Sequence, residues 1–230
     1  MALLFHSTAE KAREAIRGID APYLLRTYDA TPEDYELIAD EDFRCEYLDG
    51  VLVVHSPATF AHEDRSSFLS ALLRTFVEHR RYGWVLGANA VMQLGERRFC
   101  PDISFLHATH ADRIQGGRVM GPMDLAVEFL SKSTRDYDLR EKRTSYREGR
   151  IPEIWLIDTD LREFHVDVLV AAPGKTNGSG APYRTELLRQ GRWSSQVLNG
   201  FWVDVTWFWS EPLPSVLDCF NAITDASQST

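Results

Sequence analysis

The chain has 230 residues, 44% of them hydrophobic, and a formal net charge of −9 at pH 7. This length fits one α/β domain with extensions rather than two independent cores. The negative charge argues against broad electrostatic adhesion to nucleic acid or an anionic membrane, and no apolar run approaches the roughly 20 residues of a membrane span. The three cysteines have no zinc-site or disulfide-framework spacing, so we expect a cytoplasmic protein with no membrane partner.

The N-terminal part predicts a helix followed by a hairpin. Residues 1–30 are weakly patterned, and we treat them as an extension containing a short helix near 8–17. Thr31-Pro32-Glu33-Asp34 indicates a helix start, with Thr31 as N-cap, Pro32 in the first turn and acids beside it, and the helix should reach about Ala39. Strands are expected over Cys45–Leu48 and Val51–His55, because Asp49-Gly50 between them is typical of a hairpin turn.

The middle of the chain predicts the main helix of the domain and several strands. Apolar residues recur with helical spacing between Ala61 and Arg81. Trp84–Gly87 and Ala90–Leu94 have the pattern of strands, and a turn is expected at Gly95–Arg98. Ile103–Leu106 is a short apolar run that follows Pro101, so a strand should begin there.

Two acids fall at the ends or inside these apolar runs. Asp102 immediately precedes the strand at 103–106, and Glu128 is the only charged residue in the apolar run Leu125–Leu130. A lone carboxylate in a buried strand needs a partner, because burying an unpaired charge is costly. If the two strands are neighbours, Asp102 and Glu128 can converge on a hard divalent cation such as Mg²⁺ or Mn²⁺, with Lys142 beside them.

The remaining elements complete the expected domain. We predict a helix from about Asp136 to Glu148, a buried strand at Ile154–Asp158 and a strand at Phe164–Val170 that pairs with it. Ala171–Pro182 has the composition of a surface loop, and Tyr183–Trp209 is strand-like and aromatic.

The predicted organisation is one domain in four parts. They are an N-terminal extension (1–30), a core (31–170), a C-terminal β extension of the same domain (171–221) and a flexible tail (222–230).

Ordered blocks along residues 31–170 resemble a known family. The blocks are Arg44 with Glu46-Tyr47-Leu48-Asp49-Gly50, Ser56-Pro57 with His62, Pro101-Asp102, Glu128-Phe129-Leu130-Ser131, Asp138 with Lys142, Tyr146 and Gly149, and Glu153-Ile154-Trp155-Leu156-Ile157-Asp158. Together they resemble the Uma-two family of putative restriction endonucleases, within the PD-(D/E)XK nuclease superfamily. The resemblance implies an α/β (α+β) fold, a restriction-endonuclease-like mixed sheet flanked by helices, with an N-terminal helix and hairpin and a C-terminal β extension.

The resemblance also implies a metal site. Asp102 and Glu128 match the metal-binding acids of the superfamily, the backbone carbonyl of Phe129 is a further ligand, and Glu46 matches a family acid that completes the site. The sequence departs from the superfamily pattern at Leu130, where that pattern has lysine. Lys142, on the following helix, occupies the place from which this family supplies the lysine.

Three candidate roles keep an alternative on the sequence alone. Lys142 is either the active-site cation, which we favour, or an ion-pair partner of Asp138 four residues earlier on a solvated helix face. Tyr146, one turn beyond Lys142, either contacts substrate or packs on the sheet. His62, at the start of the long helix, either contacts substrate or is structural.

The leading functional hypothesis is a Mg²⁺-dependent endonuclease, with Mn²⁺ as a possible substitute, that hydrolyses duplex DNA through Asp102, Glu128, Lys142 and Glu46. One alternative is an inactive nuclease-fold module that binds nucleic acid or protein; another is a metal-dependent hydrolase of a smaller phosphate ester. We further expect a homodimer, because six C-terminal aromatic residues exceed what one strand pair needs: Trp193, Phe201, Trp202, Trp207, Phe208 and Trp209.

Overall fold

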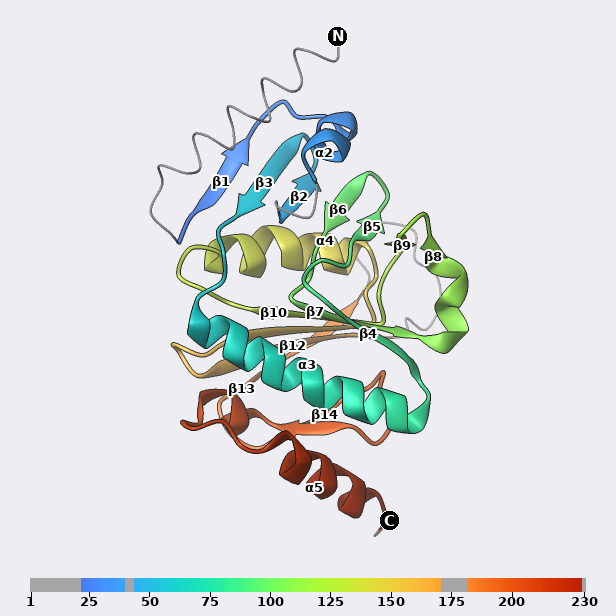
Figure 1. Ribbon diagram of the computed structural model, residues 1–230, viewed down its shortest axis with the longest axis vertical. Helices are drawn as coiled ribbons and strands as arrows, with labels where there is room; N and C mark the ends of the chain where they lie inside the picture. Colours follow the sequence, from blue (N-terminus) through green and yellow to red (C-terminus); the bar gives the residue numbers. More distant parts are fainter. Residues whose placement is uncertain (1–21, 40–43, 171–181, 229–230) are drawn as a thin grey trace.

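The computed structural model describes residues 22–39, 44–170 and 182–228. Two large β-sheets with helices packed against them form a mixed α+β fold, as predicted (Figure 1). The helix expected near 8–17 and nearly all of the loop expected at 171–182 lie outside the described residues. Within the described ranges, no helix combines the length and apolar character needed to cross a lipid bilayer.

A six-stranded sheet forms the centre of the molecule, in the order β13-β12-β11-β10-β7-β4. Its strands are β4 (Gly83–Gly87), β7 (Ile103–His107), β10 (Leu125–Phe129), β11 (Glu153–Asp158), β12 (Glu163–Leu169) and β13 (Tyr183–Leu188). β10 is antiparallel to β7 and parallel to β11. A parallel pair needs a crossover connection, which η2 (Tyr137–Lys142) and α4 (Arg143–Glu148) supply between β10 and β11.

The second large sheet contains the N-terminal hairpin, in the order β1-β3-β2-β6-β5-β9-β8. Its strands are β1 (Leu24–Thr27), β2 (Cys45–Leu48), β3 (Val51–His55), β5 (Met92–Leu94), β6 (Arg97–Phe99), β8 (Ile114–Gln115) and β9 (Arg118–Met120). The predicted hairpin is confirmed: Asp49 and Gly50 both have positive φ, 47° and 87°, as a tight hairpin turn requires. The turn expected over Gly95–Arg98 is shorter, since Arg97 already pairs with Leu94.

Two helical segments lead into strands of this sheet. α2 (Pro32–Ile38) begins at the predicted N-cap, where the Thr31 side chain accepts a hydrogen bond from Asp34 N–H and the Asp34 carboxylate accepts one from Thr31 N–H. This reciprocal capping box satisfies backbone donors that a helix start leaves free. η1 (Ala108–Arg113) is a 3₁₀ segment between β7 and β8.

Both faces of the six-stranded sheet are buried. α3 (Phe60–Arg80) covers one face, where its residues Leu69 and Phe76 pack in a cluster with Val127 and Phe129 of β10. α4 and the seven-stranded sheet cover the other face, where Ala126 of β10 joins a second cluster. Because neighbouring residues of a strand point to opposite faces, Glu128 falls on the α4 side.

The C-terminal aromatic residues complete the core of their own chain. Phe201 and Phe208 are 1% and 0% exposed and pack with α3 and Trp155 of β11. Trp193 and Trp202 are also buried, in β14 (Arg192–Ser194) and β15 (Trp202–Asp204), while the tryptophans of η3 (Val205–Trp209) pack partly buried against the same cluster. The argument from surplus aromatics to a dimer was therefore wrong, and the homodimer itself stays a prediction.

The end of the chain also differs from expectation. A helix, α5 (Val216–Gln228), occupies most of the segment expected to be a flexible tail after residue 222. Ile223 is fully buried in the core cluster and Phe220 stacks edge-on against His79 of α3. The segment is rich in polar residues, but Phe220 and Ile223 lie on one face of the helix and pack against α3 and the core.

Two arginines of α4 anchor this helix to the sheet. Arg143 and Arg147 each form two hydrogen bonds with the buried carboxylate of Asp167 in β12, and Thr185 donates a further one. Burial alone would raise the pKa of Asp167, but the two guanidinium groups and Thr185 outweigh it and hold that pKa well below its usual range. The crossover helix is thereby fixed to the sheet.

Replacing Asp167 with asparagine should lower the free energy of unfolding by about 2–3 kcal/mol at pH 7. Removing one partner of a completely buried ion pair costs more, about 3–5 kcal/mol. We expect a smaller loss here because the Arg147 side chain is partly exposed. Because the folded-state pKa is depressed, this stabilisation is present above the unfolded-state pKa of about 4 and is lost as the pH falls through the folded-state value. Urea unfolding of both proteins should show the difference shrinking from pH 6 toward pH 3; a constant difference would contradict the ionic origin.

Candidate active site

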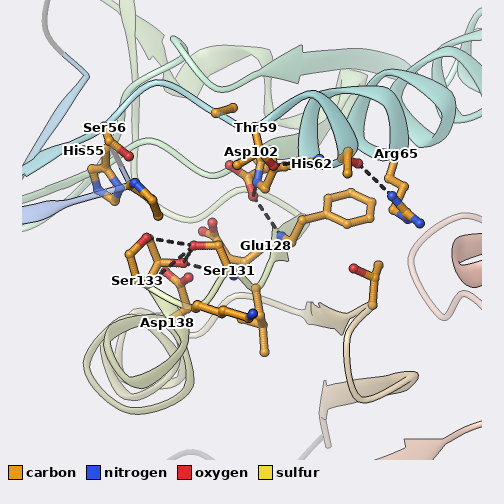
Figure 2. Close-up of a pocket in the computed structure, with 18 of the residues that line it drawn as sticks. His55, Ser56, Thr59, His62, Arg65, Asp102, Glu128, Ser131, Ser133 and Asp138 are labelled. Carbon is orange, nitrogen blue, oxygen red and sulfur yellow. Dashed lines mark hydrogen bonds and ion pairs between the residues drawn. The ribbon is translucent and has the colours of Figure 1, made fainter. Parts of the chain in front are cut away.

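A cavity of about 310 Å³ opens where β10 ends and α3 begins. Asp102, Glu128, Asp138, Lys142 and His62 are among its lining residues. Figure 2 shows Asp102 and His62 together beneath the start of α3, with Ser131, Ser133 and Asp138 on the facing side. Most of the titratable residues singled out from sequence therefore meet at one place.

The pairing of β7 with β10 brings the two predicted acids together. The register matches Ile103 with Val127, so Asp102 and Glu128 are the next opposed pair, and opposed residues project from the same face. The backbone N–H of Phe129 donates a hydrogen bond to Oδ2 of Asp102 at 2.8 Å. Sequence reasoning predicted this juxtaposition, and the structure confirms it.

Two side chains, Arg44 and His62, hold Asp102. Arg44 places Nη2 at 2.8 Å from Oδ1, and His62 places Nε2 at 3.1 Å from Oδ2. Burial favours the neutral acid, yet Arg44 and His62 outweigh it, so the pKa of Asp102 lies well below its usual range. Asp102 is an anion in the folded protein.

Glu128 is in a different electrostatic environment. Its Oε1 accepts a hydrogen bond from the Tyr146 hydroxyl at 2.6 Å and lies 2.7 Å from Lys142 Nζ. Burial is the largest influence and, reinforced by repulsion from Asp102 and Asp138, it raises the pKa of Glu128 to about 8 despite the attraction of Lys142. The surroundings of Glu128 thus favour its neutral form.

The orientation predicted for Lys142 is confirmed. Lys142 is fully buried, and its Nζ lies nearer to Glu128 than to Asp138, at 2.7 Å against 3.7 Å. This excludes the alternative of an ion pair with Asp138 on a solvated face. The lysine ends η2, a π-helical segment that the sequence pattern did not predict; such turns are frequent at functional sites.

Glu46 was expected to complete the metal site, but it does not line the cavity. It is fully buried. Its Oε1 accepts a hydrogen bond from Cys100 N–H at 2.8 Å and forms an ion pair with Lys142 Nζ at 3.0 Å. Its other oxygen lies 2.9 Å from His55 Nε2. Attraction by Lys142 and His55 overcomes burial and lowers the pKa of Glu46 below its usual range.

Comparison with models of known protein families identifies the family of the chain. The family model Uma2, described as "Putative restriction endonuclease", matches residues 32–206. The chain belongs to the Uma2 family. No curated protein matches it.

The fold of this Uma2 protein also occurs in a solved structure. A crystal structure described as a putative nuclease belonging to DUF820, from Anabaena variabilis ATCC 29413, superposes with a TM-score of 0.60 at 16% identity. The match covers 84% of this chain and 99% of that one. Family and fold are therefore those of nuclease-like proteins, whose restriction-endonuclease-like relatives generally use divalent metals.

The residues that line the cavity of this Uma2 protein fit a divalent cation by their chemistry. Asp102, Glu128 and Asp138 offer carboxylate oxygens, the donors that Mg²⁺ and Mn²⁺ prefer. Within residues 22–39, 44–170 and 182–228, however, no three Asp, Glu, His or Cys side chains form a ready-made metal site. Asp102 and Glu128 would thus be the two protein carboxylates of a site that needs other oxygens to complete it, and the Phe129 carbonyl stays a proposed one.

Two side chains of the Uma2 site were not assigned a role from sequence. Arg44 lies just before β2 and donates to the Cys100 carbonyl as well as pairing with Asp102. His55 ends β3 and contacts Glu46. Arg44 stood in the family blocks, but its partner is far away in sequence, and no spacing rule connects residues 44 and 102.

The two substrate-contact candidates of the Uma2 site, Tyr146 and His62, differ in their access to the cavity. Tyr146 is fully buried and its hydroxyl is bonded to Glu128, so it supports the acid and is not placed to touch substrate. His62 lines the cavity, and its Nδ1 is buried with no hydrogen-bond partner in the described part of the chain. Its position in the cavity lining keeps His62 as the substrate-contact candidate.

Proposed function

We propose that this protein is a Mg²⁺-dependent endonuclease that hydrolyses DNA phosphodiester bonds. The supporting observation is the meeting of Asp102, Glu128 and Lys142 at one cavity, with Lys142 Nζ 2.7 Å from Glu128. Family membership supports the nucleic-acid substrate. Mn²⁺ would be a functional substitute, because both ions take hard oxygen ligands.

Each residue has a distinct task in this proposal. Asp102 and Glu128 would hold the cation, which when bound activates water and neutralises phosphate charge. Lys142 would place its ammonium beside the negative charge that develops on the phosphate, the kind of preorganised contact that lowers a barrier most. Arg44 keeps Asp102 ionised and in place.

The departure from the superfamily pattern at Leu130 does not favour the inactive binding module. Its side chain is 5% exposed and packs in the apolar cluster beside α4. In this proposal, Lys142 provides the ammonium that the superfamily carries at that position, because it reaches Glu128 from the neighbouring helix. The two carboxylates and the ammonium that the proposed hydrolysis requires thus line one cavity.

A second candidate substrate is a smaller phosphate ester. The cavity measures about 310 Å³, and Glu128 and Lys142 at its base are 2% and 0% exposed. A compact ester could reach these groups without the distortion that a polymer backbone needs. DNA remains the leading substrate because of the family.

The proposed location and assembly follow from the same chemistry. Cys100 and Cys219 are buried and form no disulfide, as in a reducing cytoplasm. A homodimer would bring two active sites to the two strands of a duplex. This geometric argument is what supports the proposed homodimer.

Supercoiled plasmid incubated with Mg²⁺ or Mn²⁺ should be nicked and linearised by the wild-type protein and left intact in the presence of a chelator. Asp102→Asn should lower the rate by at least 10²-fold, the scale of losing one preorganised transition-state contact. Asp112→Asn, on the exposed η1, is the matched control. Turnover of p-nitrophenyl phosphate without plasmid cleavage would favour the small ester, and neither activity would favour the binding module.

A further inference from the structure

Glu46 contacts the catalytic machinery from behind. The cavity is lined by Asp102, Glu128 and Lys142, whereas Glu46 contributes nothing to that lining and is fully buried. Both of its oxygens are occupied, one by Cys100 N–H and Lys142, the other by His55. Three of the roughly four lone-pair sites of this carboxylate therefore already have partners, and the residue does not line the cavity.

Lys142 is a side chain that needs an anchor. Its four-carbon stem is flexible, and its ammonium lies between Oε1 of Glu128 at 2.7 Å and Oε1 of Glu46 at 3.0 Å. The rings of Tyr137 and Tyr146 flank it at 5.9 Å and 5.8 Å. Glu128 approaches from the six-stranded sheet and Glu46 from the seven-stranded sheet, so the ammonium is held from two sides.

The anchor is itself fixed. Cys100 N–H belongs to the segment that leads into Asp102, so the hydrogen bond from Cys100 ties Glu46 to the backbone two residues before the predicted metal ligand. His55, at the end of the paired strand β3, holds the second oxygen. Neither contact requires a cation.

We propose that Glu46 is a positioning residue, which fixes the ammonium of Lys142 beside Glu128 and does not bind the metal. This inference rests on the proposed nuclease function and changes the role of one residue that the resemblance had made a ligand. A misplacement of about 1 Å in a catalytic group can cost on the order of 10²-fold in rate. Glu46 therefore acts on turnover through Lys142.

The test compares Glu46→Gln with Asp102→Asn and with the exposed control Glu78→Gln. Calorimetric titration with Mn²⁺ should give Glu46→Gln an affinity within about twofold of wild type, whereas Asp102→Asn loses binding. In plasmid cleavage, Glu46→Gln should keep KM and lose 10- to 100-fold in kcat. Loss of Mn²⁺ affinity in Glu46→Gln equal to that in Asp102→Asn, or an unchanged kcat, would overturn the proposal.

A readout that needs no cleavage separates this proposal from the nuclease proposal. The ¹⁵N-labelled ammonium of Lys142 should give a slowly exchanging NMR signal in the wild type, since it is buried and ion-paired with Glu46 and Glu128. Exchange should be faster in Glu46→Gln and in His55→Asn. The His55→Asn variant keeps the test decisive if Glu46→Gln does not fold. An exchange rate unchanged in both variants would refute the positioning role of Glu46, even if the wild type cleaves plasmid. If the wild type does not cleave, the nuclease proposal fails, and the exchange rates still test the positioning role.

Discussion

Lys142→Met is expected to reduce cleavage by at least about 10²-fold, because it removes the only ammonium that the described part of the chain places beside Glu128. The same change leaves Glu128, Glu46 and Asp138 buried without their shared cation. Removing one partner of a buried ion pair costs about 3–5 kcal/mol, so the free energy of unfolding should fall by a similar amount.

Folding and catalysis have to be measured separately in this variant. Urea unfolding gives the folded fraction under assay conditions, and cleavage rates are divided by it. Lys132→Met is the matched control, because Lys132 also lines the cavity but is exposed; its stability should change by less than about 0.5 kcal/mol. Cleavage per folded molecule equal to wild type in Lys142→Met would remove the lysine from the mechanism.

The second large effect concerns Glu153, which lies at the start of β11 outside the active site. Glu153 is fully buried, and within the described residues it forms no ion pair with a lysine, arginine or histidine. Its carboxylate accepts hydrogen bonds from five neutral donors: the indole N–H groups of Trp155 and Trp193, the Ser195 hydroxyl, and the backbone N–H groups of Gln196 and Val197. These bonds attach the C-terminal extension to the central sheet.

Glu153→Ala should destabilise the protein by more than about 4 kcal/mol. Each buried donor left without an acceptor costs about 1–3 kcal/mol, and the total stability of a domain is about 5–15 kcal/mol. Circular dichroism and urea unfolding should therefore show a largely unfolded or much weakened protein. Glu78→Ala, an exposed glutamate paired only with Arg74 on α3, should differ from wild type by less than about 0.5 kcal/mol. A loss below 1 kcal/mol in Glu153→Ala would show that water replaces the carboxylate.

Features set by neighbouring residues could be predicted from sequence. The hairpin at Asp49-Gly50 and the capping box at Thr31 depend on a few consecutive positions, and both were confirmed. The juxtaposition of Asp102 and Glu128 was predicted on the condition that their strands are neighbours, and the pairing of β7 with β10 meets that condition. The place of Lys142 came from the family resemblance.

Features set by distant partners could not be predicted. β1 is a short strand that exists because β3 offers an edge for pairing, and its own sequence carries no turn or periodic signal. The direction of the Arg143 side chain is determined by Asp167 in β12, a partner 24 residues away in the sequence. Glu46 matched a family acid, yet only the three-dimensional contacts with Cys100 and His55 show that it lies behind the cavity.

The arrangement of Lys142 between two sheets has a consequence for the order in which the site forms. Its anchors, Glu46 and Glu128, belong to separate sheets, so both sheets must be assembled and docked before the ammonium is fixed. Chains emerge from the ribosome N-terminus first, and contacts between residues far apart in sequence form late. Among Glu46, Asp102, Glu128 and Lys142, the lysine is synthesised last. A growing chain thus carries acids without their cation, and if cleavage requires Lys142, the protein becomes a nuclease only once its fold is complete.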